Sequence, residues 1–314
     1  MINPKVLTSE SSSRGARAGR RRRSAGAWQA VLMTGFAVAA GCGSQTPVPY
    51  LGPSSLPATE IGQHSSALAG KDGVGAIILP NQTVNRYARV VANIRPGDKT
   101  IQVMGLAAFN VAVDDLLMIM QMQGASLDFT DTINYGTVTN YNGAGRYEFV
   151  TVTGVDLATN TISVAACKGG IRNAYSAADH TQVVRVPQYT TLTVGLAGSI
   201  VAPAWDGNVG GIVAIHAQTS VTVNGSIDVS ARGFRPGLLD NQTTAPNSSL
   251  PIFRALNATM GGEKGEGIGG YSADYDNSGG RYGRGAPGNG GGGGNSHNAG
   301  GGGGANAATR PWRR

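Results

Sequence analysis

The sequence predicts an all-β protein with three parts: a small antiparallel β domain, then strands of a β-helix or a sandwich, then a glycine-rich low-complexity segment. Short runs of β-branched and aromatic residues alternate with Gly, Asn, Asp and Pro clusters, as is typical of strands and turns. Glycine accounts for 49 of 314 residues, which disfavours helix interiors. Of these, 21 lie between Gly261 and Gly304, so much of the excess belongs to one segment.

The N-terminus has the pattern of an export signal. Arg20–Arg23 precede a short apolar run, Ala25–Ala40, which is shorter than the ~20 residues of a membrane-spanning helix. Small residues before Cys42 resemble the lipobox of bacterial lipoproteins, although Ala39 stands where leucine is more usual. That resemblance implies cleavage before Cys42 and acylation of its thiol. Ordinary signal cleavage, leaving Cys42 free, is the alternative.

The positive charge is concentrated in this leader. The net charge is +7, and residues 1–41 hold seven basic side chains against Glu10, which leaves +1 (7 − 6) for the rest. A basic face for nucleic acid is therefore not expected. Gly43 and Ser44 supply no aspartate that would retain a lipoprotein at the inner membrane, which favours the outer membrane or the cell surface.

The expected organisation follows from changes in composition along the chain. Its parts are a signal peptide (1–41), a lipid-anchored flexible tether rich in proline (42–73), an antiparallel β domain (74–196), β-helix-like strands with a polar loop (197–260), the glycine-rich segment (261–306) and an aberrant tail (307–314). The abrupt arrival of Arg, Pro and Trp after residue 307 suggests the end of a truncated or frameshifted reading frame.

Strands in the antiparallel domain are expected at 100–103, 115–123, 146–155, 161–164, 181–186 and 190–194. Their connections are too short for intervening helices, which favours antiparallel pairing. Further short strands at 198–203, 211–217, 220–225 and 226–230 are separated by Gly or Asn turns. This spacing is close to that of solenoid rungs, but an antiparallel sandwich would give a similar pattern.

The glycine-rich segment admits two interpretations. Plain glycine-rich chains behave as flexible linkers. Alternatively, glycines without side chains allow polyglycine-type strands to stack closely through their backbones. The two five-glycine blocks flanking Asn295–Ala299 suggest such a specific structure.

Few residues form motifs that carry chemistry. The four histidines are scattered, and no zinc, nucleophile-elbow or phosphate-loop spacing occurs. Asp274, Asp276 and Ser278 match the first half of a calcium loop, but Gly285 stands where an EF-hand places its bidentate glutamate. A partial surface calcium site is therefore the single cofactor candidate.

Sugar recognition and sugar chemistry have separate candidate residues. Trp205, next to Asp206, and Tyr189 are candidates for stacking on a sugar ring, and the alternative for Trp205 is a tryptophan that packs a tight turn. Glu148, Asp206 and Asp228 are the carboxylates that a carbohydrate-active β-helix would use. No catalytic pair is evident in the sequence, so we expect no enzymatic activity.

Several segments together resemble a family of large bacterial surface proteins that includes proteins labelled as adventurous gliding motility proteins and many lipoproteins. They are LLMIMQMQGA (116–125), YEFVTVTGV (147–155), QVVRVPQY (182–189), APAWDGNVGGIVAI (202–215), VNGSIDVSARGFRPG (223–237) and GNGGGGGNSHNAGGGGGAN (288–306). The resemblance implies a surface or envelope role in motility or adhesion. It supplies no catalytic residue, and such proteins usually continue beyond the glycine block.

These observations predict a non-enzymatic cell-surface lipoprotein with a structural or adhesive role, with gliding motility as one role that the resemblance implies. The alternative is a carbohydrate-binding or carbohydrate-active β-helix protein. The expected partners are the membrane, through the lipid anchor, and surface polysaccharide or envelope proteins.

Overall fold

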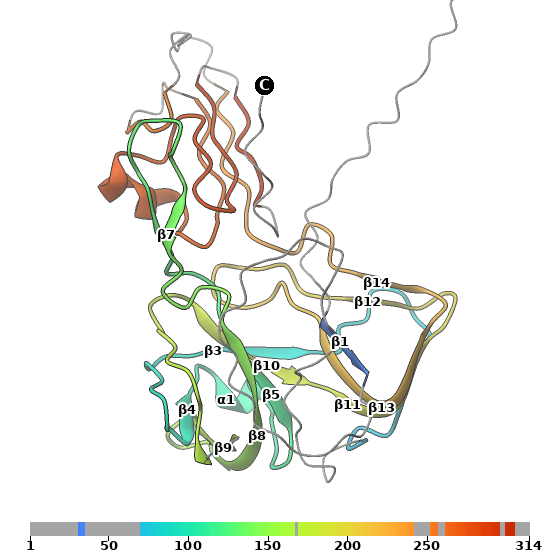
Figure 1. Cartoon of the computed structure of the whole chain (residues 1–314). Coiled ribbons are helices and arrows are strands. Elements are labelled where there is room, and N and C mark those ends of the chain that lie inside the picture. Colours follow the sequence, from blue (N-terminus) through green and yellow to red (C-terminus); the bar gives the residue numbers. More distant parts are fainter. Residues whose placement is uncertain are drawn as a thin grey trace, which may run out of the picture.

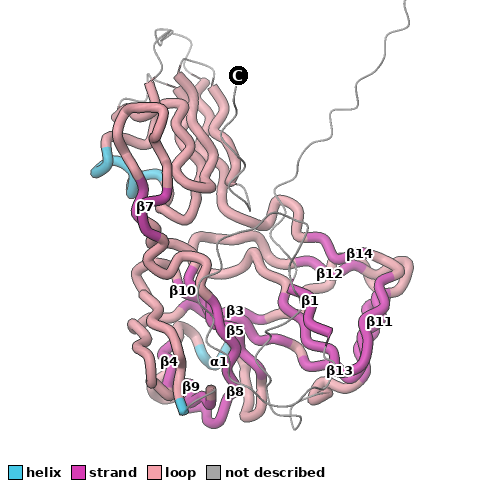
Figure 2. The backbone as a smooth tube through the Cα atoms, in the orientation of Figure 1, coloured by secondary structure: helices cyan, strands magenta, loops and turns pink. Residues whose placement is uncertain are grey.

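A computed structural model describes residues 31–34, 70–166, 169–241, 252–256, 261–295 and 299–304. The described chain is all-β, as the sequence predicted, and forms three regions that we call the barrel, the solenoid and the glycine array (Figures 1 and 2). Helices are short, as in the one-turn α1 (Leu106–Phe109) and the 3-10 helix η4 (Ser272–Ser278). Among the described residues, none of the helices has the length and apolar character needed to cross a membrane.

The barrel is a six-stranded antiparallel sheet. Its strands, in spatial order, are β3 (Arg86–Arg89), β10 (Thr181–Val186), β5 (Leu116–Gln121), β8 (Tyr147–Asp156), β9 (Thr161–Ala165) and β4 (Thr100–Gln102). The sheet curls until its two edges meet through an antiparallel bridge between Val90 and Val103. Closure leaves no free edge at this seam. The long strand β8 turns the corner at an irregularity between Val152 and Gly154.

Both faces of the barrel sheet are covered. Along β5, Leu117 and Ile119 point into the barrel, whereas Leu116 and Met118 pack outward against a second cluster that includes Trp205. Alternate residues of a strand point to opposite faces, so a strand that is covered on both sides reads as a continuous apolar run. This explains the unbroken hydrophobic character of LLMIM.

The solenoid consists of three rungs stacked by parallel pairing. One wall stacks β2 (Val74–Ile77), β11 (Gln188–Val194) and β13 (Ala214–Val223); the other stacks Gln82, β12 (Ser199–Val201) and β14 (Ser226–Asp228). At the outer edge of β13, β1 (Val31–Thr34) pairs in parallel. This strand lies within the predicted signal peptide (1–41), so cleavage before Cys42 would remove it from the mature protein. In Figure 1 these strands lie beside the barrel.

Apolar side chains and glycine corners hold the rungs together. Val194 pairs in register with Ile77, and Ile200 with Ile227, so aliphatic side chains of successive rungs stack on one another inside the solenoid. At the corners the backbones nearly touch: a Cβ on Gly198 would lie 2.0 Å from the carbonyl oxygen of Ile77, and one on Gly225 would lie 2.1 Å from that of Gly198. Only glycine fits such an approach.

The pairing corrects the expected boundaries. Antiparallel strands were expected over 74–196, but β2 and β11 at the two ends belong to the parallel solenoid. The barrel is therefore inserted between the first and second rungs, and the expected boundary at 196/197 falls inside the second rung. Parallel pairing of β12, β13 and β14 confirms the β-helix-like interpretation of this region over the sandwich.

The glycine array (261–295 and 299–304) is a set of extended segments lying side by side above the other two regions (orange to red in Figure 1). Backbone amides and carbonyls join neighbouring segments, for example Gly265 N to Gly291 O at 2.8 Å and Gly302 N to Gly292 O at 2.8 Å. Outside η4, its described residues are thus extended segments joined by backbone hydrogen bonds, as the polyglycine interpretation expected, and not a flexible linker.

An arm of the barrel reaches the array. It consists of β6 (Ser126–Leu127), β7 (Val138–Asn140) and the loop between them. The amides of Gly124 and Ala125 both donate to the carbonyl of Ile268, at 2.9 and 3.0 Å, and Gly288 N donates to Gly136 O at 3.0 Å. The array is therefore joined to the barrel along its side as well as at its base.

Candidate functional site

Trp205 lies in the interior, so the prediction that it stacks on a sugar is wrong. Its side chain is 3% exposed, and its ring meets His180 and Phe234 edge-on, with centroids 6.3 and 6.2 Å away. The indole nitrogen donates to Glu266 Oε1 at 2.9 Å. A ring enclosed in this way has no face left for a ligand from solvent.

Glu266 is the charged centre around which the three regions meet. It is fully buried and accepts from Gln123 Nε2 of the barrel and from Trp205 Nε1, both at 2.9 Å. Arg235 completes the set with its backbone amide at 3.0 Å and two guanidinium bonds at 2.8 and 3.0 Å. The hydrogen bonds to Glu266 raise the pKa of Arg235. Buried charges are tolerated when they are paired in this way.

Lys264 is a second buried charge inside the array. Its ammonium donates to the carbonyls of Phe253, Gly283 and Gly285 at 2.5, 2.8 and 2.8 Å, and lies 4.6 Å from the centre of the Tyr135 ring. Burial lowers the pKa of this group to about 7, although the carboxylate of Asp131 opposes the shift. Lys264 and Glu266, in the segment EKGE (263–266), therefore stabilise the array from its interior, a role that the sequence did not predict.

Tyr189, the other stacking candidate, is part of the solenoid. It is half-buried and packs against the solenoid core over Gly75, where an added Cβ would lie 2.8 Å from its ring. Burial raises the pKa of its phenol, and the nearby Asp72 adds to the shift. Its ring is therefore used mainly in packing, so the structure does not support a sugar-stacking role.

The calcium candidates occupy a helix and not a loop. Asp274, Asp276 and Ser278 fall in η4. A 3-10 helix has three residues per turn, so side chains two residues apart point in different directions. Asp274 accepts the backbone amide of Tyr271 at 2.8 Å, and both oxygens of Asp276 accept from Arg281. Across the described ranges, no cluster of three or more acidic, His or Cys side chains could hold a metal. The predicted calcium site is therefore not formed.

The three carboxylates considered for sugar chemistry serve local structure. Glu148 is 4% exposed and accepts from the amides of Arg172 and Asn173 and from the Tyr175 hydroxyl, each at 3.0 Å. Asp206 and Asp228 each accept backbone amides two or three residues ahead, as in ordinary Asx turns. The structure places these groups in β8, in a loop and in β14, and does not bring them into one cleft.

Cys42 and the tail 307–314 lie outside the described residues, as do most of the leader, the tether and the polar loop. Their expected roles in export, anchoring and chain termination stay predictions.

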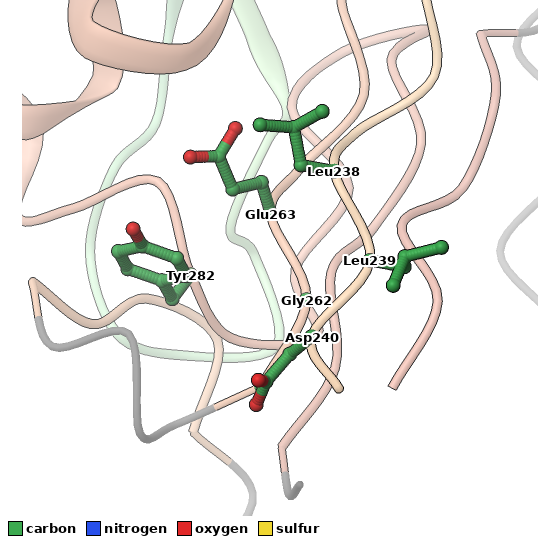
Figure 3. A pocket seen from close by; sticks show the side chains of 7 residues that line it. Leu238, Leu239, Asp240, Gly262, Glu263 and Tyr282 are labelled. Carbon is green, nitrogen blue, oxygen red and sulfur yellow. The ribbon is translucent and has the colours of Figure 1, made fainter. Parts of the chain in front are cut away.

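A pocket that sequence reasoning did not predict opens on the glycine array (Figure 3). Its volume is about 200 Å³, and it is lined by Leu238, Leu239, Asp240, Gly261, Gly262, Glu263 and Tyr282. In Figure 3 the Tyr282 ring stands across from the Leu238–Asp240 segment, with the Glu263 carboxylate near its hydroxyl end. The pocket thus combines an aromatic ring, an aliphatic side chain and two carboxylates.

Comparisons with known proteins give little further information. No family model and no curated protein matches the chain. Among solved structures, it is similar to the Gp54 tailspike of Acinetobacter baumannii bacteriophage AP22, solved in complex with A. baumannii capsular saccharide. The identity is 15% and the TM-score 0.24, and the match covers 49% of this chain and 26% of the tailspike chain. At that TM-score the likeness supports no inference about function.

Proposed function

We propose that this chain is a non-enzymatic, lipid-anchored protein of the bacterial cell surface with an adhesive role, in which the β body carries the glycine array as its contact surface. Lipidation of Cys42 and attachment to the outer membrane are part of this proposal and rest on the lipobox-like leader. Gliding motility is one process in which such an adhesin would serve.

The observation that carries the proposal is the ordered packing of the glycine array on the body. Backbone bonds join its segments, and Glu266 and Lys264 fix it from below and within. A contact surface that is rigid before binding loses little conformational entropy when it meets a partner. The carboxylates that an enzyme of this fold class would use are instead bound to structural partners.

The proposal is tested by producing the full chain in a Gram-negative host and measuring both its location and the attachment of the cells. We expect surface exposure by protease shaving, and stronger attachment of expressing cells to polysaccharide-coated surfaces than of cells with an empty vector. Cys42→Ser should release the protein from the membrane fraction and abolish the gain in attachment. Membrane fractionation of this variant at the wild-type level would contradict the anchor.

A carbohydrate-binding protein is the second candidate, and the pocket at Tyr282 is the observation that favours it. A surface adhesin and a carbohydrate-binding protein are compatible, since the pocket would supply the adhesin's ligand specificity.

A further inference from the structure

We propose that the pocket between Tyr282 and the Leu238–Asp240 segment binds a single non-acidic pyranose ring of a surface polysaccharide. This inference deepens the adhesive function proposed above and rests on it.

The aromatic wall is held firmly in place. Tyr282 is half-buried, and its backbone forms an antiparallel bridge with Ala255, with hydrogen bonds of 2.9 and 3.1 Å in the two directions. Burial raises the pKa of the phenol, which stays protonated at neutral pH and bonds to Glu263. The ring therefore has a fixed position, and the C–H face of a pyranose can stack on a fixed aromatic ring.

The carboxylates give the pocket its chemical preference. Glu263 and Asp240 are 7% and 9% exposed, and both line the pocket. A carboxylate accepts hydrogen bonds but donates none, so it suits sugar hydroxyl or ammonium groups and repels a uronate. The Arg281 guanidinium lies 3.4 Å from Glu263 and also forms an ion pair with Asp276. One positive charge therefore faces two carboxylates, and the group keeps a net negative charge.

The aliphatic side and the size limit the ligand to about one ring. Leu238 is 62% exposed beside the pocket, whereas Leu239 projects from the other side of the segment (Figure 3). Gly261 and Gly262 line the pocket with backbone, and their Cβ positions face the neighbouring segment, 2.4 Å from Gly294 and 2.8 Å from Ala299 O, so their lack of side chains serves the packing of the array. The volume of about 200 Å³ lies below the roughly 300–1,000 Å³ of sites for drug-sized ligands.

The test uses the purified full chain on a glycan array of neutral, amino and uronic-acid oligosaccharides, followed by calorimetry with the strongest binder. We expect binding to neutral or amino sugars and none to uronates. Tyr282→Ala should weaken binding by about tenfold or more, since truncating a central aromatic contact typically costs over ~1 kcal/mol. Tyr282→Phe keeps the ring but loses the hydroxyl bond to Glu263, so it should bind more weakly than wild type and more tightly than Tyr282→Ala.

Two further variants separate the pocket from general effects. Tyr141→Ala removes a 60%-exposed tyrosine from the barrel side and should bind like wild type. Glu263→Gln keeps the shape but removes a charge, and should admit uronic-acid sugars. Because Glu263 is paired with Arg281, the thermal midpoint of each variant is measured beside its binding, and binding is compared per folded protein so that a folding defect is not counted as a loss of affinity.

The outcomes distinguish the pocket from the adhesive function. If wild type binds sugars and Tyr282→Ala binds them equally well, the pocket is not the site, while the adhesive function stands. Preference for uronates would also overturn the inference. If the protein binds no glycan although expressing cells still attach, the pocket proposal fails and adhesion has another basis. If neither occurs, both proposals fail.

Discussion

The barrel and the glycine array differ in what fills the space between their strands. In the barrel, side chains such as Val150, Ile162 and Val183 are fully buried and occupy the interior of a closed sheet. In the array, backbone lies directly on backbone: a Cβ on Gly291 would sit 2.1 Å from the carbonyl carbon of Gly302. The barrel therefore depends on burial of apolar area, and the array depends on hydrogen bonds between main chains.

This difference has an energetic consequence. Apolar burial stabilises the barrel by about 25 cal/mol per Å². Glycine offers almost no such area and loses more conformational freedom on folding than other residues. The array therefore needs another source of stability: the buried carboxylate of Glu266 supplies charge-assisted hydrogen bonds at its base, and the Lys264 amine donates to backbone carbonyls at its centre.

Removing the charged centre should break the array while sparing the barrel. Glu266→Ala leaves Arg235 without its carboxylate and orphans the donors of Trp205 and Gln123. Each buried donor left without its acceptor costs about 1–3 kcal/mol, whereas the Arg235 side chain is 36% exposed and can be hydrated. We expect amide hydrogen exchange to rise across 261–304 but little at β5 and β10. Uniform protection in both regions of the variant would show that the array does not depend on this centre.

Single Gly→Ala substitutions should test the same difference between the array and the barrel with a smaller loss of stability. Gly291→Ala has no room for its Cβ, and overpacking of this kind costs about 1–3 kcal/mol. In the barrel, Gly154→Ala meets only Ser163 at ordinary contact distance, 3.4 Å, and should be tolerated. Thermal unfolding of the two variants would measure the difference.

Gly303→Ala is the matched control within the array, because its Cβ would meet nothing within 4 Å. It should melt like wild type. If Gly291→Ala and Gly303→Ala melted alike, the close backbone packing would not be a source of stability.

The sequence predicts the barrel strands better than their partners. The run 181–186 coincides with β10, because alternation and β-branched residues are local signals. Which strands pair, and in which direction, depends on distant contacts: β2 and β11 lie more than a hundred residues apart and pair in parallel. The insertion of the barrel into the solenoid therefore leaves no mark in local composition.

The site residues were harder to predict than the strands. From the sequence, Trp205 could stack on a sugar or pack a turn, and its burial, which decides between the two, depends on Phe234 and Glu266 in later segments. Asp274 and Asp276 have calcium-loop spacing, but the local backbone is helical, which separates them. The pocket joins residues near 240, 262 and 282, and only the folded array brings these together.

A third charged cluster joins the barrel to the solenoid. Of the changes predicted, its protonation should have the smallest effect on stability. Asp115, at the start of β5, accepts from Lys71 Nζ at 2.7 Å and from Arg185 at 3.0 Å, and Arg185 also bonds to Asp72 at 2.6 Å. Lys71 and Asp72 directly precede the first rung, so the cluster fastens that rung to the barrel. Unlike Glu266, several of these groups are partly exposed, so solvent screens their attraction.

Acid should weaken this junction before it affects the apolar barrel core. Burial acts to raise the pKa of Asp115, but hydrogen bonds from Arg185 and Lys71 outweigh it, so the pKa in the folded protein is lowered. The unfolded chain then binds the proton more readily, so the stabilisation is fully present above the ordinary carboxyl pKa of about 4 and is lost as pH falls through the lowered value. Wild type should therefore lose denaturant resistance below about pH 4 more steeply than Asp115→Asn, which has no proton to gain at this position. Chemical denaturation at several pH values measures both slopes. Equal slopes would mean that Asp115 does not link the rung to the barrel through its charge, and that the apolar contacts of β5 alone hold the junction.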